Sequence, residues 1–124
     1  MKKLFTFLLL LLFITSCYQP QRDCQTFKNG TFTFTSLIEG KETTTTFIRK
    51  DAIEIDYFEK KIDTSSIRWI NDCEYIIRKM NPTNKAEEKS IHIKILSTTD
   101  DSYTFEYSLV GNSQKSRGTA IKIK

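Results

Sequence analysis

The residues of this sequence that could do chemistry are three cysteines, one histidine and three pairs of neighbouring carboxylates. A thiol can form a disulfide, bind a metal ion or act as a nucleophile, and an imidazole beside a carboxylate can move protons. Cys24 and Cys73 lie outside any Cys-x-x-Cys spacing, and neither has a neighbouring histidine. A disulfide is therefore the favoured interpretation of these two residues, and a metal centre or a redox thiol pair is the alternative.

The histidine and the carboxylates do not form a recognisable catalytic arrangement. His92 alternates with Ile91 and Ile93, which predicts that its ring faces solvent beside Lys94. The acidic pairs lie in or beside turns, where solvated carboxylates are ordinary: Asp72/Glu74, Glu87/Glu88 and Asp100/Asp101. The sequence contains no nucleophile with an activating partner, no glycine-rich phosphate loop and no histidine pair at metal-binding spacing. It therefore predicts no enzyme, with no catalytic residue, no metal site and no cofactor.

The N-terminal residues have the pattern of an export signal. Lys2 and Lys3 precede an apolar run over residues 4–14, which is well short of the ~20 residues that a membrane-spanning helix needs. The order Ile14-Thr15-Ser16-Cys17 resembles the lipobox of bacterial lipoproteins. That resemblance implies cleavage after residue 16 and attachment of acyl chains to Cys17. An ordinary secretory cleavage site is the alternative.

The resemblance to lipoproteins also implies a location. Tyr18 follows the cysteine where an aspartate would signal retention in the inner membrane, so we expect a protein lipid-anchored to the outer membrane and facing the periplasm. Thiols are oxidised in that compartment. Because Cys17 would carry lipid, Cys24 and Cys73 are the pair expected to form a disulfide.

The mature chain has the size of one domain and little net charge. We expect residues 1–16 to be a cleaved signal peptide, residues 17–23 a lipidated tether and residues 24–124 a single domain. Of the 124 residues, removal of 16 leaves 108, which suits one core. Loss of Lys2 and Lys3 lowers the formal net charge from +4 to +2. So small a charge on an exported protein does not favour a nucleic-acid partner.

Apolar and polar residues alternate with a period of two along most of the mature chain, which predicts strands with one buried and one solvated face. Turn residues separate these runs. The expected strands span residues 31–38, 43–49, 52–58, 62–70, 74–80, 90–97, 103–110 and 118–123. The residues expected on their buried face include Phe32, Phe34, Ile53, Ile55, Tyr57, Ile67, Trp69, Ile91, Ile93, Ile95, Tyr103, Phe105, Tyr107, Leu109, Ile121 and Ile123.

The pattern of strands and connections predicts an all-β fold. Short connections favour an antiparallel up-and-down meander of about eight strands, which buries one face without covering helices by closing into a small barrel. A two-sheet sandwich fits the same pattern and is the alternative. The longest connection, residues 81–89, has room for one polar helical turn but lacks an apolar face, so we expect an exposed loop.

Aromatic residues with polar tips fall on the apolar face of the expected strands: Tyr57, Trp69, Tyr75, Tyr103 and Tyr107. Each polar tip needs a hydrogen-bond partner inside the barrel. An eight-stranded barrel is just wide enough to be filled by side chains or to hold one small ligand. The many large inward residues favour a filled core, and a cavity in which these five residues orient a ligand is the alternative.

Two stretches resemble known proteins. Gly30-Thr31-Phe32, at the start of the first expected strand, is similar to the Gly-x-Trp that opens lipocalin-like barrels, with Phe32 in place of the tryptophan. The lipobox together with Arg68-Trp69-Ile70-Asn71-Asp72-Cys73-Glu74-Tyr75 resembles a group of small uncharacterised Gram-negative lipoproteins. Some proteins of that group carry a DNA topoisomerase IV label, which a chain without a nucleotide loop or a catalytic-tyrosine context does not support.

These resemblances imply a lipocalin-like barrel on a lipid anchor. We therefore expect a non-catalytic binding module that contacts the membrane through its anchor and binds a small apolar ligand or an envelope protein. The alternative function is that of a structural or assembly accessory lipoprotein with a filled core and no ligand.

Overall fold

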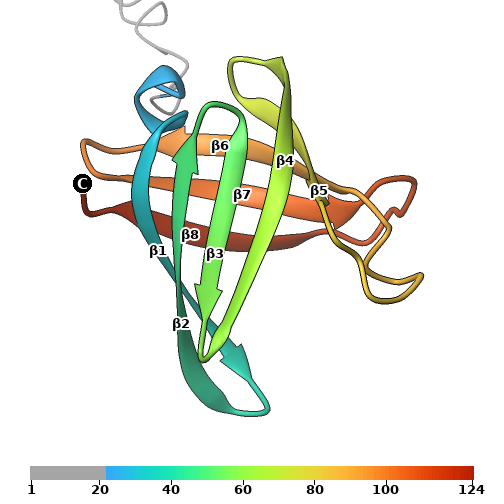
Figure 1. Ribbon diagram of the computed structural model, residues 1–124. Coiled ribbons are helices and arrows are strands. Elements are labelled where there is room, and N and C mark those ends of the chain that lie inside the picture. The colour runs from blue at the N-terminus through green and yellow to red at the C-terminus, as the bar shows by residue number, and fades with distance from the viewer. Residues whose placement is uncertain (1–21) are drawn as a thin grey trace, which may run out of the picture.

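Each strand of this chain pairs with its sequence neighbours in antiparallel fashion, and the last strand returns to the first. In the computed structural model, which describes residues 22–124, this meander forms a closed barrel (Figure 1). The leader, Cys17 and residues 18–21 of the tether lie outside the described residues. The strands are β1 (Gly30–Ile38), β2 (Lys41–Lys50), β3 (Ile53–Phe58), β4 (Lys61–Asn71), β5 (Glu74–Lys79), β6 (Ile91–Thr98), β7 (Ser102–Leu109) and β8 (Ser116–Lys122).

The predicted eight-stranded barrel is confirmed. A two-sheet sandwich is not formed, because Phe32, Thr33 and Phe34 of β1 pair with β8 and close the sheet on itself. The single short helix in residues 22–124 is the 3-10 helix η2 (Gln25–Phe27). No helix in this part of the chain has the length and apolar character that a membrane crossing requires.

Tight turns set the register of the first strands. Asp51 and Ala52 connect β2 to β3 with positive φ angles of 53° and 63°, the conformation of the two-residue turns that match the twist of antiparallel strands. Glu39 and Gly40 connect β1 to β2 in the same way, with φ angles of 52° and 77°. In a hairpin this short, the turn decides which residues stand opposite each other.

The register places β3 with its charged residues inside the barrel. Phe47 stands opposite Asp56 and Arg49 stands opposite Glu54, and directly opposite residues share one face of the sheet. Glu54 is accordingly 6% exposed, whereas Tyr57 is 39% exposed on the outer face. The prediction that the apolar residues of this strand form its buried face is therefore wrong for Ile53, Ile55 and Tyr57.

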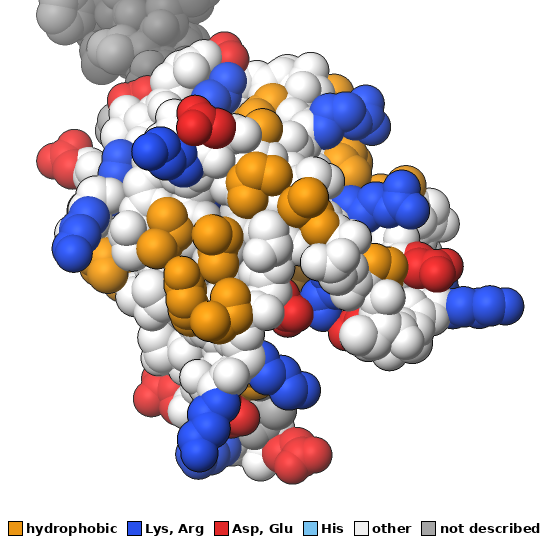
Figure 2. Space-filling model, in the orientation of Figure 1, with side chains coloured by type: hydrophobic (Ala, Val, Ile, Leu, Met, Phe, Trp, Pro, Cys, Tyr) orange, Lys and Arg blue, Asp and Glu red, His pale blue; other side chains and the backbone are white. Residues whose placement is uncertain are grey.

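The outer surface carries the apolar residues that β3 does not bury. Ile48 stands opposite Ile55, and Tyr57 opposite the exposed Ile62 of β4, so these side chains form cross-strand pairs on the outside. Apolar side chains gather on the face of the molecule where β2 and β3 lie (Figures 1 and 2). Strand β3 is thus inverted relative to a strand of an ordinary half-buried sheet.

Strand β8 differs from the prediction for a steric reason. Its inner face carries Gly118 and the fully buried Ala120, which leaves Ile121 and Ile123 outside at 47% and 53% exposure. A Cβ atom on Gly118 would lie 2.5 Å from a ring carbon of Phe34. Small residues on β8 therefore make room for rings on the neighbouring strands β1 and β7, and the prediction that Ile121 and Ile123 are buried is wrong.

Helix η2 closes one end of the barrel. Phe27 is fully buried there, with its ring centroid 5.2 Å from that of Tyr103. The predicted disulfide is confirmed: Cys24 and Cys73 are bonded and tie the helix to the turn between β4 and β5 across a sequence separation of 49. The buried core consists of Cys24, Phe27, Phe32, Phe47, Ile67, Tyr75, Ile77, Ile93, Ile95, Tyr103, Phe105 and Ala120.

Candidate ligand-binding cavity

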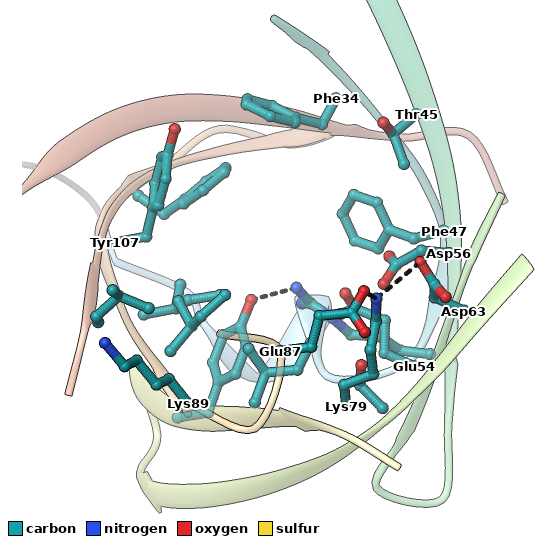
Figure 3. A pocket seen from close by; sticks show the side chains of 18 of the residues that line it. Phe34, Thr45, Phe47, Glu54, Asp56, Asp63, Lys79, Glu87, Lys89 and Tyr107 are labelled. Atoms are coloured by element: carbon teal, nitrogen blue, oxygen red, sulfur yellow. Dashed lines mark hydrogen bonds and ion pairs between the residues drawn. The ribbon is translucent and has the colours of Figure 1, made fainter. Parts of the chain in front are cut away.

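The barrel is packed at the η2 end but encloses a cavity of about 410 Å³ farther along its axis. This volume lies within the range of sites that hold small molecules. The expected filled core is therefore present in only one part of the barrel (Figure 3). The residues that line the cavity are Phe34, Thr45, Phe47, Arg49, Glu54, Asp56, Asp63, Ser65, Tyr75, Ile77, Lys79, Ala86, Glu87, Lys89, Ile91, Ile93, Tyr103, Phe105, Tyr107 and Leu109.

Arg49 forms the floor of the cavity. It is 3% exposed, and its Nε donates to a carboxylate oxygen of Glu54 at 2.7 Å. Its Nη1 donates to the backbone carbonyl of Phe27 at 3.1 Å, which joins the floor to helix η2. Its Nη2 donates to the hydroxyl oxygens of Tyr75 and Tyr103, the latter at 2.7 Å. The guanidinium is thus hydrogen-bonded through all three of its nitrogens, as a buried charge requires.

The two tyrosines at the floor remain neutral. Burial raises the pKa of the Tyr75 and Tyr103 hydroxyls, because a phenolate would lose its hydration there. Each hydroxyl can therefore accept from Arg49. The guanidinium carbon also lies 4.7 Å from the ring centroid of Tyr75 and 5.1 Å from that of Phe32, so aromatic faces surround the cation as well.

Carboxylates occupy one wall of the cavity. Asp56 of β3 stands directly opposite Asp63 of β4, and Glu54 lies two residues earlier on the same face of β3. Burial, together with the negative charges of Glu54 and Asp63, raises the pKa of Asp56 to about 8, although Arg49 opposes the shift. Like charges that stand opposite each other destabilise a sheet, and the raised pKa of Asp56 means that this cost applies in full only where Asp56 is ionised.

Replacement of Asp56 by asparagine should stabilise the fold at neutral and alkaline pH. A carboxyl whose pKa rises on folding stabilises the native state when protonated, and this contribution is lost as pH rises from 3.8 to about 8. We expect Asp56→Asn to raise the free energy of unfolding at the upper end of that range by on the order of 2 kcal/mol. Urea denaturation across the pH range measures it. Asp100→Asn, in an exposed turn, is the control and should show the same dependence of stability on pH as the unmodified protein. The prediction would be contradicted if Asp56→Asn also showed that same dependence.

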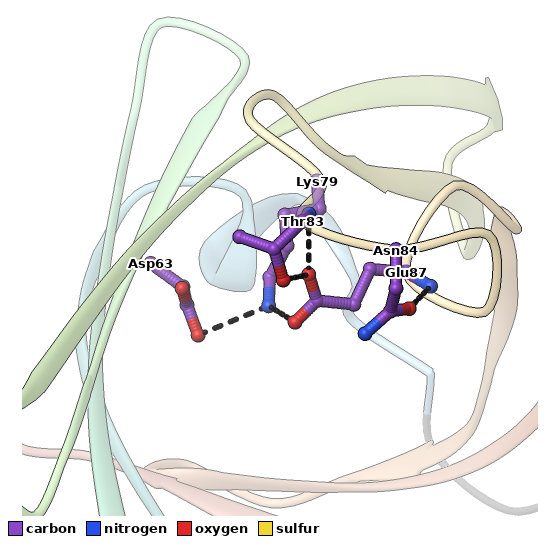
Figure 4. A network of polar contacts seen from close by, with 5 residues as sticks. All are labelled: Asp63, Lys79, Thr83, Asn84 and Glu87. Atoms are coloured by element: carbon purple, nitrogen blue, oxygen red, sulfur yellow. Dashed lines mark hydrogen bonds and ion pairs between the residues drawn. The ribbon is translucent and has the colours of Figure 1, made fainter.

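The loop between β5 and β6 forms the mouth of the cavity. Lys79 of β5 lies 3.3 Å from Asp63 and 2.8 Å from Glu87, so it connects the acidic wall to the loop (Figure 4). Glu87 also accepts hydrogen bonds from the backbone and hydroxyl of Thr83, and its own backbone N–H donates to the Asn84 side chain.

Residues 85–88 of this loop form a hydrogen-bonded turn rather than a helix, and the Asn84 side chain accepts from the Glu87 backbone N–H at its start. The ion pair with Lys79, followed by the bonds from Thr83, lowers the pKa of Glu87 to about 2. Most of the loop is exposed as predicted, but the Glu87 side chain is only 29% exposed and lines the cavity. The expectation of a merely solvated turn carboxylate is therefore wrong for Glu87.

The five aromatic residues predicted to orient a ligand are separated by the structure. Tyr75, Tyr103 and Tyr107 line the cavity. Trp69 packs at 4.6 Å from the Tyr75 ring and lies under the ammonium of Lys28, away from the cavity. Tyr57 lies on the outer face of β3. The roles of all five residues in ligand binding stay predictions. Only Tyr75, Tyr103 and Tyr107 lie where they could contact a molecule in the cavity.

Sequence reasoning missed the charged lining of the cavity: Arg49, Glu54, Asp56, Asp63 and Lys79. Charged residues that alternate with isoleucines are typical of a solvated face, so the period of two predicted that Glu54 and Asp56 of β3 face solvent, which is wrong. A usable signal was the short connection at Asp51 and Ala52, which links the faces of β2 and β3.

The remaining chemistry-bearing residues lie away from the cavity. The His92 Nε2 lies 3.0 Å from a carboxylate oxygen of Glu74 on the outer surface, where the ring is partly exposed as predicted. The hydrogen bond from His92 lowers the pKa of Glu74. Within residues 22–124, no three His, Cys, Asp or Glu side chains are grouped closely enough to hold a metal ion.

A comparison with known protein families, curated proteins and solved structures finds no match to this chain. Function therefore has to be inferred from the cavity and from the residues around it.

Proposed function

We propose that this chain is a non-catalytic binding protein whose barrel holds one small molecule. The cavity of about 410 Å³ between the packed core and the β5–β6 loop is the observation that carries the proposal. Eight-stranded barrels are wide enough for one such ligand, and ligand sites usually combine an apolar lining with a few placed polar groups. The rings of Phe34, Phe105 and Tyr107 and the charged groups on β3 and β4 form a lining of this kind.

The proposal includes a place in the cell. Residues 1–17 support export, a lipid on Cys17 and an anchor in the outer membrane with the barrel facing the periplasm. The Cys24–Cys73 disulfide is independent support for export, because disulfides persist in oxidising compartments. A carrier tethered in this way would keep its ligand close to the membrane.

Native mass spectrometry of the protein purified from the cell envelope tests the proposal. A bound molecule would appear as a mass difference between native and denatured spectra. Thr45→Trp fills the cavity from β2, whereas Thr46→Trp places the same side chain on the outer face of the same strand. We expect the unmodified protein and Thr46→Trp to retain the molecule and Thr45→Trp to lose it.

An empty cavity in the unmodified protein would overturn the proposal. That outcome would favour the alternative, an accessory lipoprotein that works through its surface, and cross-linking in intact envelopes would then identify its neighbours. Retention of the same molecule by Thr45→Trp would also count against the cavity as the site.

A further inference from the structure

The cavity has two chemically different sides. Its apolar side comes from β1, β6 and β7 and includes Phe34, Phe105 and Tyr107. The ring centroid of Phe105 lies 5.5 Å from that of Phe34 and 5.7 Å from that of Tyr107. Its acidic side comes from β3 and β4. Asp56 and Asp63 lie across the cavity from Tyr107 (Figure 3). A molecule that filled the space would contact rings at one end and carboxylates at the other.

The carboxyl groups of the lining are not each paired with a cationic side chain. Four carboxyl groups line the cavity against three cationic side chains. Arg49 is paired with Glu54, and Lys79 is shared between Asp63 and Glu87. The third cation, Lys89, is exposed on the loop at the mouth. Within residues 22–124, these ion pairs leave Asp56 without a cation of its own.

The neighbours of Asp56 define what is missing there. Glu54 and Asp63 are both acidic, and the residue opposite on β2 is Phe47. Arg49 is near enough to act on Asp56 through space, but its hydrogen bonds go to Glu54, Phe27 and the two tyrosines. A positive charge placed beside Asp56 would meet the carboxylates of Glu54 and Asp63 and would favour the ionised form of Asp56, whereas a negative charge would be repelled by Glu54 and Asp63.

We infer that the cavity takes a small amphipathic cation, with an ammonium head beside Asp56 and Asp63 and an apolar body against the rings of Phe34, Phe105 and Tyr107. This inference rests on the proposed function, since it names the class of molecule that the cavity holds. Asp56 is half-buried, so a charge contact there contributes more than it would at a fully exposed surface. A hydrogen bond or ion pair of this kind favours the cation over an uncharged analogue by about tenfold or more.

The inference is tested with a matched series of probes: hexylamine, hexyltrimethylammonium, hexanol and hexanoate. Isothermal titration uses the full chain in lipid nanodiscs, and empty nanodiscs correct for partition of each probe into lipid. We expect both cations to bind at least about tenfold more tightly than hexanol, and hexanoate to bind most weakly. Asp56→Asn should reduce the affinity for the cations by about tenfold and leave that for hexanol unchanged. Asp100→Asn, in an exposed turn, should change neither.

The possible outcomes separate this inference from the proposed function. Equal binding of hexanol and the cations, tighter binding of hexanoate, or unchanged cation binding by Asp56→Asn would overturn the inference while the cavity remained a binding site. Failure of every probe, together with an empty cavity in native mass spectra, would overturn both. Asp56→Asn is expected to be more stable than the unmodified protein, so a loss of cation binding by this variant would not reflect unfolding.

Discussion

Arg49→Met is expected to lower the free energy of unfolding by about 3 to 5 kcal/mol, the usual cost of removing one partner of a buried ion pair. The substitution leaves the Glu54 carboxylate, 6% exposed, without its cation. It also removes the donors to the Phe27 carbonyl and to the hydroxyls of Tyr75 and Tyr103. Urea denaturation followed by circular dichroism measures the change.

Two variants separate the buried charge from a general effect of replacing arginine. Arg117→Met changes an arginine whose side chain is 70% exposed and should alter the free energy of unfolding by no more than about 0.5 kcal/mol. The double variant Arg49→Met/Glu54→Met removes both charges of this ion pair, so the loss should be smaller than for Arg49→Met alone. A single variant within about 1 kcal/mol of the unmodified protein would show that the floor of the cavity is not held by Arg49.

Loss of the disulfide is expected to have the second large effect. Cys24→Ser and Cys73→Ser should each lower the free energy of unfolding by up to ~4 kcal/mol, as estimated from the chain entropy of a loop that spans 49 residues. The two single variants should be equally destabilised, because either one removes the same bond. The double variant should be no less stable than either single variant. Denaturation midpoints of the three variants, measured without reductant, provide the comparison.

Reduction of the disulfide is the control for this prediction. Dithiothreitol should lower the midpoint of the unmodified protein and leave that of the double variant unchanged. Additive losses in the two single variants would contradict a bond between Cys24 and Cys73. The bond also secures helix η2, whose Phe27 contributes both a ring and a carbonyl to the closed end of the barrel.

The inverted strand β3 connects the fold to the proposed function. Real proteins break the rules of patterning where function requires it, and β3 does so by facing Glu54 and Asp56 inward and Ile55 and Tyr57 outward. Glu54 has a structural partner in Arg49. Asp56 has no such partner among the ion pairs of residues 22–124, and it raises the energy of the folded state at neutral pH. A residue that destabilises the fold and lines a cavity is a strong candidate for ligand recognition.

About half of the candidate site could be predicted from the sequence. Tyr103 and Tyr107 fall on the apolar face of a strand that alternates regularly, Tyr75 was also expected to face inward, and all three line the cavity. The charged half could not be predicted in the same way. Asp56 alternates with isoleucines and was assigned to solvent, because a period of two identifies two faces but assigns them inward or outward only by polarity.

The sequence by itself determined the kind of fold and its covalent closure. Alternating residues and short turns are local features, so they predicted eight antiparallel strands, and the pairing of Cys24 with Cys73 followed from the expectation that Cys17 carries lipid. Only the tertiary structure decided which face of β3 points inward and whether the barrel is filled. The orientation of β3 depends on the register across the turn at Asp51 and Ala52 and on the ion pair that the buried Arg49 forms with Glu54. The size of the cavity depends on how the side chains of all eight strands pack in one interior. No single strand contains that information, because the interior exists only after the strands have closed around it.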